Sequence, residues 1–499
     1  MKDFVINNYE YRIICEGETS DTSLDFETEN DRLGVFITAI NDRPRFVEIR
    51  WNFKSSGDIW VLSDAWERSY ADLGFKKLAD NCRAMPWYFA ATDKKSTFCL
   101  GVETQPNSFV SFRYDESGVT ALIDCRNGGS GVKLGGRKVK LCTFVYSRYA
   151  LEPFEALCSF CKELCDNPLL PGEVIYGGNN WYYAYGKSSY EEIISNSALQ
   201  AELSEGIANR PYMVIDDGWQ INSCKGPYLP NEKFRDMKTL AGEIKSLGVR
   251  PGIWVRLLDN ASDEITDDMK ILRGGKREYL DPTDSRVKDF VRRDIERIKS
   301  WGYEMLKHDF STVDLFGNYG KDLTDTITNC ENWHFADETK TNAEIVLDFY
   351  RLIKEACGDM LIIGCNTVSH LCAGLVHINR TGDDTSGREW DRTRRMGVNT
   401  LAFRLCQNKA FYLADADCVG ILDDNIPWEK NRQWLDVLSK SDTALFTSCA
   451  ALDGSQTADI KKAYKEIQKR HTVKPIDIYE NPTPREWEID GIMTVYNWD

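Results

Sequence analysis

The chain has 499 residues and a hydrophobic fraction of 42%, which indicates a globular protein of two or three domains. No apolar run approaches the roughly 20 residues that cross a bilayer, and the formal net charge of −16 disfavours nucleic acid or an anionic membrane as a partner. Residues 1–10 lack the basic start and apolar centre of a secretion signal, so we expect a cytoplasmic protein whose sixteen cysteines are reduced.

The amino-terminal part of the chain predicts an antiparallel β-sandwich. Short runs rich in Val, Ile, Phe and Thr, such as 45–52, 98–103 and 139–146, are separated by clusters of Gly, Asn and Asp. A helical segment over 153–165 follows and leads to Pro168 and Pro171. We therefore expect a sandwich domain over residues 1–168 with a boundary at these prolines.

Beyond the prolines, apolar strands alternate with amphipathic helices over residues 172–455. The predicted strands are 174–176, 212–215, 250–255, 303–306, 360–364, 375–378, 410–413 and 443–447, and the predicted helices include 285–300 and 343–356. This α/β pattern predicts a (β/α)8 TIM barrel, with a doubly wound sheet as the alternative. Residues 456–499 predict a helix and the opening strand of a short or truncated β-domain.

Polar residues follow most of the predicted strands, at the barrel end that carries active sites. They are Asn179, Asn180 and Trp181; Asp216, Asp217 and Trp219; Arg256; Lys307 and Asp309; Cys365 and Asn366; Arg380 and Asp383; and Asp415 and Asp417. A single Asp after a strand is commonly a helix cap. Convergence from several strands indicates a functional site instead.

Two of these acids suit glycoside hydrolysis, which needs one carboxylate to attack or stabilise the sugar cation and one to protonate the leaving oxygen. Lys307 precedes Asp309 by two residues, so both side chains point to one face and the cation favours an ionised Asp309. The second acid, Asp383, must be protonated when substrate arrives. The adjacent Asp384 is a like charge that would raise its pKa.

The ordered motifs resemble the α-galactosidase clan of glycoside hydrolases, families twenty-seven and thirty-six above all. The motifs are Asp216-Asp217-Gly218-Trp219, Lys307-x-Asp309, Cys365 and Thr381-Gly382-Asp383. The resemblance covers residues 174–449, and the predicted sandwich resembles the amino-terminal domain of family thirty-six. It implies a retaining α-galactosidase with Asp309 as nucleophile and Asp383 as acid/base. By its offset from Arg380, Asp384 is the alternative acid/base.

The resemblance also implies a set of substrate-binding residues. Asp216 and Asp217 would bind the outer hydroxyls of galactose, Lys307 and Arg380 would contact ring hydroxyls, and Cys365 would line the pocket floor. Trp181 and Trp219 would stack on the sugar, unless one of them is barrel packing.

Two positions depart from the family pattern. Arg256 stands where family thirty-six has an acid, and it would either bind an anionic substituent or pair with Asp259 or another acid. Asn366 begins the segment that replaces a Gly-rich stretch after Cys365, so we expect a different subsite beyond the first sugar.

Metal catalysis at Asp415 and Asp417 or at Asp216 and Asp217 is a competing interpretation. The five histidines show no ligand spacing, and no phosphate-binding Gly motif is present, so we expect neither a metal nor a cofactor. The expected partner is an oligosaccharide or glycoside substrate, and a homo-oligomer is compatible with the sequence. A galactosyl-transferring enzyme and a non-catalytic carbohydrate-binding relative remain alternatives.

Overall fold

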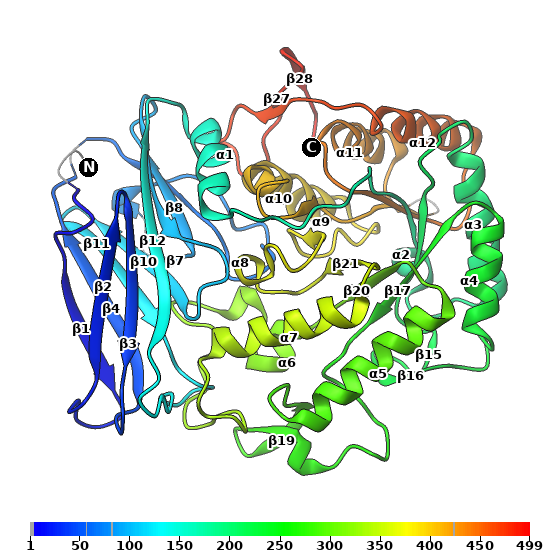
Figure 1. Cartoon of the computed structure of the whole chain (residues 1–499). Coiled ribbons are helices and arrows are strands. Elements are labelled where there is room, and N and C mark those ends of the chain that lie inside the picture. The colour runs from blue at the N-terminus through cyan, green and yellow to red at the C-terminus, as the bar shows by residue number, and fades with distance from the viewer. Residues whose placement is uncertain (1–3, 56, 81–82, 423–424) are drawn as a thin grey trace.

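The computed structural model describes residues 4–55, 57–80, 83–422 and 425–499 (Figure 1). A β-sandwich, blue to cyan in Figure 1, lies beside a larger α/β part coloured green to orange. The predicted combination of an amino-terminal sandwich and a barrel is confirmed. The first three residues of the predicted sandwich domain lie outside the described residues.

The sandwich is built from two antiparallel sheets. The first has five strands in the order β1 (Glu10–Cys15), β4 (Pro44–Asn52), β11 (Gly118–Asp124), β10 (Phe109–Asp115) and β7 (Met85–Pro86). The second has seven, in the order β2 (Ser23–Glu29), β3 (Arg32–Thr38), β12 (Val139–Tyr149), β9 (Thr97–Val102), β8 (Tyr88–Thr92), β5 (Trp60–Ser63) and β6 (Lys76–Lys77). Aromatic residues pack between them, as where Trp51 meets Phe144 edge to face at 5.1 Å.

Helix α1 (Pro153–Leu164) leads out of the sandwich, one residue shorter than predicted. Its buried face repeats at helical spacing through Leu157, Phe160, Cys161 and Leu164. The cysteines among the described residues are all free thiols.

The barrel has eight parallel strands arranged in chain order. They are β13 (Tyr176–Asn179), β14 (Tyr212–Ile215), β17 (Arg250–Val255), β20 (Met305–His308), β21 (Leu361–Gly364), β22 (Ile378–Arg380), β23 (Leu413–Asp415) and β25 (Leu445–Cys449). The ring closes where the Ala444 N–H donates to the Ala414 carbonyl oxygen at 2.9 Å. A further strand, β24 (Val419–Ile421), pairs with β25 and completes the nine-stranded sheet.

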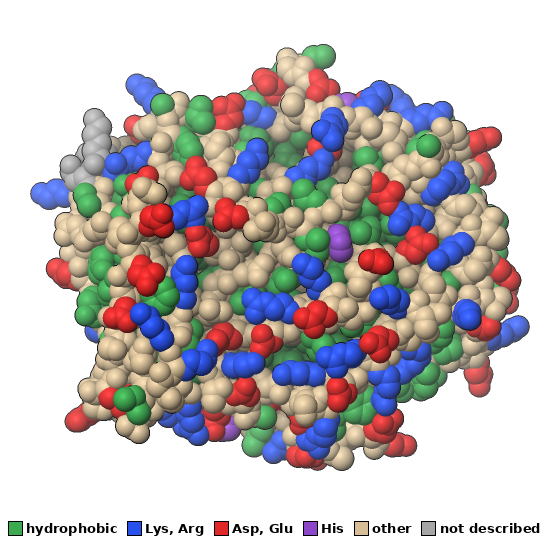
Figure 2. All heavy atoms as spheres, viewed as in Figure 1, with side chains coloured by type: hydrophobic (Ala, Val, Ile, Leu, Met, Phe, Trp, Pro, Cys, Tyr) green, Lys and Arg blue, Asp and Glu red, His purple; other side chains and the backbone are tan. Residues whose placement is uncertain are grey.

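Helices surround the barrel. The longer ones are α3 (Tyr190–Leu203), α4 (Met237–Ser246), α5 (Ser285–Trp301), α7 (Asn342–Cys357), α11 (Trp428–Lys440) and α12 (Gly454–Glu466); the shorter ones are α2 (Trp181–Ala184), α6 (Ser311–Phe316), α8 (Ser369–Cys372), α9 (Trp390–Thr393) and α10 (Asn399–Arg404). Figure 2 shows acidic and basic side chains interspersed over the face that carries α5 and α7, as expected of solvated helices. Among the described residues, no helix combines the length and apolar character needed to span a membrane.

Three small sheets complete the fold. Two hairpins, β15 (Gln220–Asn222) with β16 (Lys225–Pro230) and β18 (Lys270–Arg273) with β19 (Lys276–Leu280), follow barrel strands. A three-stranded sheet of β26 (Val473–Pro475), β27 (Glu486–Ile489) and β28 (Ile492–Val495) comes after α12. The β27–β28 hairpin projects from the body of the molecule in Figure 1.

Buried polar contacts join the sandwich to the barrel. Arg404 of α10 pairs with Asp64, which follows β5, at 2.8 Å, and each side chain is 1% exposed. Nearby, the His370 ring of α8 stacks on Trp87 with ring centroids 5.0 Å apart. A buried ion pair requires partners on both sides, so these contacts fix how the two parts dock.

Candidate active site

A cavity of about 210 Å³ opens at the carboxyl ends of the barrel strands. Its lining includes ten strand-end residues named from the sequence: Asn179, Trp181, Asp216, Asp217, Lys307, Asp309, Cys365, Arg380, Asp384 and Asp417. Arg68, Tyr182, Cys224, Trp254, Phe310 and Cys418 complete it. The cavity is smaller than the roughly 300–1,000 Å³ of pockets for drug-sized ligands, which suits one monosaccharide unit.

Asp309 lies directly after β20, where the chain turns sharply because Phe310 adopts a φ of +62°. One Asp309 oxygen accepts a hydrogen bond from the Trp254 indole at 3.2 Å, and the other from the Phe310 N–H at 2.7 Å. Burial raises the pKa of Asp309, and the charges of Arg68 and Lys307 oppose that rise. The side chain is thus fixed in place and faces the cavity.

Lys307 is paired with Asp216. Its ammonium donates to Asp216 Oδ2 at 2.7 Å, and Asn179 donates to the same oxygen at 2.9 Å. Burial lowers the pKa of Lys307, but the charges of Asp216, Cys365 and Asp309 together outweigh burial and hold that pKa above its usual value. Lys307 therefore stays charged and acts on Asp309 from a distance.

Asp217 holds the β15–β16 hairpin against the barrel. Its Oδ1 accepts from the Gln220 amide at 2.6 Å and from the Cys224 N–H at 2.7 Å. Its Oδ2 accepts from the Ser223 hydroxyl at 3.1 Å. The hairpin in this way brings the Cys224 thiol to the cavity.

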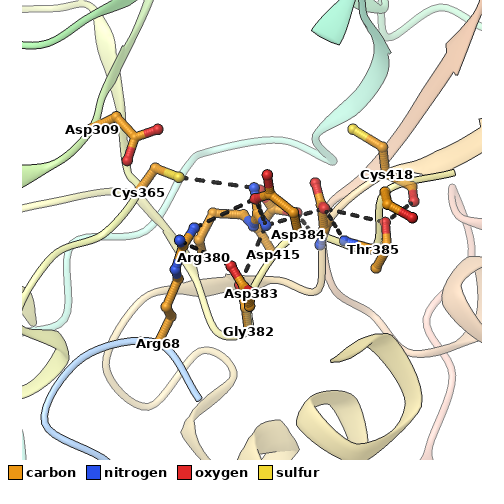
Figure 3. Close-up of polar contacts among 12 residues, drawn as sticks. Arg68, Asp309, Cys365, Arg380, Gly382, Asp383, Asp384, Thr385, Asp415 and Cys418 are labelled. Carbon is orange, nitrogen blue, oxygen red and sulfur yellow. Dashed lines mark hydrogen bonds and ion pairs between the residues drawn. The ribbon is translucent and has the colours of Figure 1, made fainter. Parts of the chain in front are cut away.

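The two candidate acid/base residues have different surroundings (Figure 3). One Asp383 oxygen lies 2.9 Å from Arg68 and the other 2.7 Å from Arg392, and Asp383 does not line the cavity. Asp384 lines the cavity, and its side chain is 36% exposed. Burial raises the pKa of Asp384, but Arg380, Arg68 and Lys307 outweigh burial and leave that pKa below its usual value.

Arg380 connects the acids at the end of β22. Its Nη2 lies 3.2 Å from Asp384 and 3.1 Å from Asp417, and its Nη1 donates to the Cys365 sulfur at 3.8 Å. Its Nε has no protein partner among the described residues. Below the cavity, burial raises the pKa of Asp415 to about 6, against the Arg380 charge. The described residues contain no group of three or more His, Cys, Asp and Glu placed to hold a metal ion.

Three predicted substrate-binding residues lie outside the cavity lining. Trp219 is fully buried, its indole donates to the Trp254 carbonyl oxygen at 2.9 Å, and it packs against Trp301, which corrects the expected stacking on a sugar. Arg256 forms a two-pronged ion pair with Asp314 at 2.6 and 3.0 Å and lies 3.6 Å from Asp259. Asn366 is fully buried, with no partner for its amide group among the described residues.

Six lining residues are not among the site residues named from the sequence: Arg68, Tyr182, Cys224, Trp254, Phe310 and Cys418. Trp254 lies within β17 and pairs in register with Lys307 on the adjacent strand. Its position two residues before Arg256, on the same face of the strand, was the available sequence signal. Arg68 comes from the sandwich, between β5 and β6, and approaches Asp384, 316 positions away in the chain. No local sequence pattern indicates a contact of that separation.

No protein-family model matches the sequence, and no curated protein matches it. Solved structures do match. An α-galactosidase from Thermus thermophilus, TtGalA, is 15% identical, with a TM-score of 0.64 over 98% of this chain and 99% of that chain. The family thirty-six α-galactosidase AgaA from Geobacillus stearothermophilus is 13% identical, with a TM-score of 0.64 over 97% of this chain and 73% of that one.

The α-N-acetylgalactosaminidase NagBb from Bifidobacterium bifidum is 11% identical, with a TM-score of 0.56 over 97% of this chain and 91% of that chain. The predicted resemblance to family thirty-six is confirmed in the fold, a sandwich followed by a curled parallel sheet. At these identities the likeness establishes the fold alone. Any chemistry must be inferred from the residues that line the cavity.

Proposed function

We propose that the protein is a retaining glycoside hydrolase that cleaves terminal α-linked galactose, or a related α-glycoside. One observation carries the proposal: Asp309 and Asp384 line one small cavity at the strand ends of the barrel. TtGalA, which shares the fold, was solved in complex with p-nitrophenyl α-D-galactopyranoside and with stachyose.

Asp309 is the proposed nucleophile. Its carboxylate attacks the anomeric carbon, the glycosidic C–O bond breaks, and a covalent glycosyl-aspartate forms. Attack requires the ionised form, which the charges of Arg68 and Lys307 favour. The hydrogen bonds from Trp254 and Phe310 orient the carboxylate for attack.

Asp384 is the proposed acid/base, in preference to Asp383. It gives its proton to the leaving oxygen, then takes one from the water that releases the sugar. Asp383 is less suited because Arg68 and Arg392 hold both of its oxygens outside the cavity. The pKa of Asp384 lies below its usual value, so the carboxyl is mainly ionised near neutral pH. Because the first step needs the protonated form, we expect higher activity at mildly acidic pH.

The remaining lining suits a polyol. Asp216 and Asp217 supply acceptors, Lys307 and Arg380 supply donors, and Trp181 supplies a partly exposed aromatic ring. The small volume supports removal of a single terminal sugar.

The direct test is nitrophenol release from α-linked nitrophenyl galactoside, N-acetylgalactosaminide, glucoside and xyloside. Preferential galactoside cleavage is the expected result, and release from none of the four would overturn the proposal. With raffinose as substrate, the ratio of free galactose to new oligosaccharide separates hydrolysis from galactosyl transfer.

The acid/base assignment is tested with a matched pair of variants. Asp384→Asn should lower kcat/KM on raffinose by about 10²–10⁴-fold, and far less on nitrophenyl galactoside, whose leaving group needs little protonation. Asp383→Asn should retain most activity on both substrates. Asp309→Asn should abolish turnover of both. The opposite pattern for the two neighbours would move the role to Asp383.

A further inference from the structure

A loop of the sandwich is hydrogen-bonded to the loop that carries Asp384. The Ser69 N–H donates to the Thr381 carbonyl oxygen at 2.9 Å, and the Asp383 N–H donates to the Ser69 carbonyl oxygen at 2.9 Å. Ser69 and Gly382 thus form a parallel β-bridge. The two hydrogen bonds fix the backbone of the sandwich loop relative to the backbone of the Asp384 loop.

This bridge places the Arg68 guanidinium beside both candidate acid/base residues. Nη2 lies 2.9 Å from Asp383 Oδ1, and Nη1 lies 3.5 Å from Asp384 Oδ1. The side chain is 10% exposed. Figure 3 shows it reaching from the sandwich loop toward Arg380 and the two acids.

Glu67 anchors the same loop from behind. It is fully buried, and one oxygen accepts from the Tyr70 hydroxyl at 2.5 Å and from the Gly320 N–H at 2.6 Å. Arg68 Nε in turn donates to the Tyr70 hydroxyl at 3.4 Å. Arg68 is therefore held by Tyr70 at Nε and by Asp383 and Asp384 at its two terminal nitrogens.

We propose that Arg68 is a positioning residue of the active site, through which the sandwich sets the orientation and charge of Asp384 and the charge of Asp309. The inference rests on the proposed function. It gives the sandwich a part in the chemistry in addition to its structural role.

The expected pH effect follows from the groups that face the two carboxyls. Around Asp384 these are Arg68 from the sandwich, Arg380 at the end of β22, Lys307 and Asp309 at the end of β20, Asp417 before β24, and Tyr182 on α2. Around Asp309 they also include Cys224 and Cys365. Arg68 is a cation for both carboxyls, so its removal raises both pKa values.

The test is the pH profile of kcat/KM for the full chain with raffinose, whose leaving group needs the proton of Asp384. Arg68→Met should move both limbs of the profile upward by about one pH unit, the lower end of the shift that a nearby charge causes. Arg68→Lys keeps a cation without the two-pronged contact, so its profile should lie between those of the wild type and Arg68→Met. A merely structural role would lower the height of the profile and leave its limbs in place.

Arg137→Met is the matched control. Arg137 also joins the sandwich to the barrel, pairing with Glu344 of α7 at 2.6 and 2.9 Å, and it does not line the cavity. An Arg68→Met profile that coincides with this control overturns the inference and leaves the proposed function standing. If Arg68→Met does not fold, unshifted limbs in Arg68→Lys overturn it. A wild type inactive on every α-glycoside overturns both.

Discussion

Arg256 shows how a residue that departs from a family pattern can be explained by its neighbours. Its guanidinium pairs with the fully buried Asp314 and lies over the Phe310 ring, 4.5 Å from the centroid. Asp314 belongs to α6, the helix that begins directly after Phe310. Arg256 therefore supports the turn that follows Asp309.

Replacing Arg256 with Met should destabilise the protein by about 3–5 kcal/mol, because Asp314 would remain buried without a partner. Burial already raises the pKa of Asp314, against the charge of Arg256. Without Arg256 the carboxyl binds a proton more readily in the folded state. The stability contributed by proton binding to Asp314 is then fully present below the unfolded-state pKa of about 3.9. That stability is lost as pH rises through the folded-state pKa.

Chemical denaturation at pH 5 and pH 8 measures this effect, with a larger loss expected at pH 8. The double variant Arg256→Met/Asp314→Asn is the control and should lose the added pH dependence. Equal losses at both pH values would show that Asp314 is not left as a buried charge.

The apolar runs of the barrel predict each of its strands but misplace many of the strand ends. The predicted strands 212–215 and 250–255 match β14 and β17, whereas 375–378 and 410–413 are observed as 378–380 and 413–415. The apolar runs ended early because the last strand residues, such as Arg380 and Asp415, are polar and face the barrel interior. Hydropathy alone cannot extend a strand into its active-site residues.

The candidate site was predictable where strand ends supply it. Asp309, Lys307 and Arg380 were found because parallel strands bring their carboxyl ends together. The distinction between Asp383 and Asp384 depends on which side chain Arg68 and Arg392 hold, and that contact forms only in the folded molecule.

Gly382 allows the Asp384 loop to pack closely against Met396 and Thr400. A Cβ there would lie 2.4 Å from Thr400 Oγ1 and 2.9 Å from the Met396 carbonyl oxygen. Gly382→Ala should therefore displace the Asp384 loop and lower kcat/KM on the order of a hundredfold, as expected of an ångström-scale misplacement. Steady-state kinetics with raffinose, whose leaving group depends on Asp384, measures the loss.

The matched control is Gly242→Ala in α4, where an added Cβ meets no atom within 4 Å. Alanine is the better helix former, so this variant should gain about 0.5–1 kcal/mol in stability with unchanged activity. Wild-type kinetics in Gly382→Ala would show that the loop tolerates the added methyl group.

At the scale of the whole molecule, the sandwich and barrel share one buried core. The hydrophobic cluster runs without interruption from Trp51 in the sandwich through Trp87 to Phe411 and Trp434 in the barrel part. His370 lies in this junction, donates its Nε2–H to the Val102 carbonyl oxygen at 2.7 Å, and has no partner for Nδ1 among the described residues. Burial lowers the pKa of His370 to about 4.

This histidine should make stability pH-dependent. A neutral buried His stabilises the fold above its unfolded pKa of about 6.5, and that stability is lost as pH falls toward the folded pKa of about 4. His370→Gln should reduce the slope of unfolding free energy against pH by about 1.4 kcal/mol per unit in this window. Denaturant titrations between pH 4 and 7 measure the slope.

The exposed His334 provides the matched control, because His334→Gln removes a histidine and leaves the contacts of His370 with Trp87 and Val102 in place. If His370→Gln and His334→Gln gave identical slopes, proton binding at the junction would not contribute to acid unfolding. His308 and His377 have pKa values lowered by burial to about 3 and about 4, so part of the slope should persist in either variant.

The bridge between Ser69 and Gly382 has a consequence for the order in which the protein matures. During synthesis, the sandwich loop leaves the ribosome long before the segment with which it pairs. Arg68 can therefore contact Asp384 only after some three hundred further residues have been added. Under the proposed function, activity is then among the last properties that a new chain acquires, because it requires that the sandwich and the barrel have already docked.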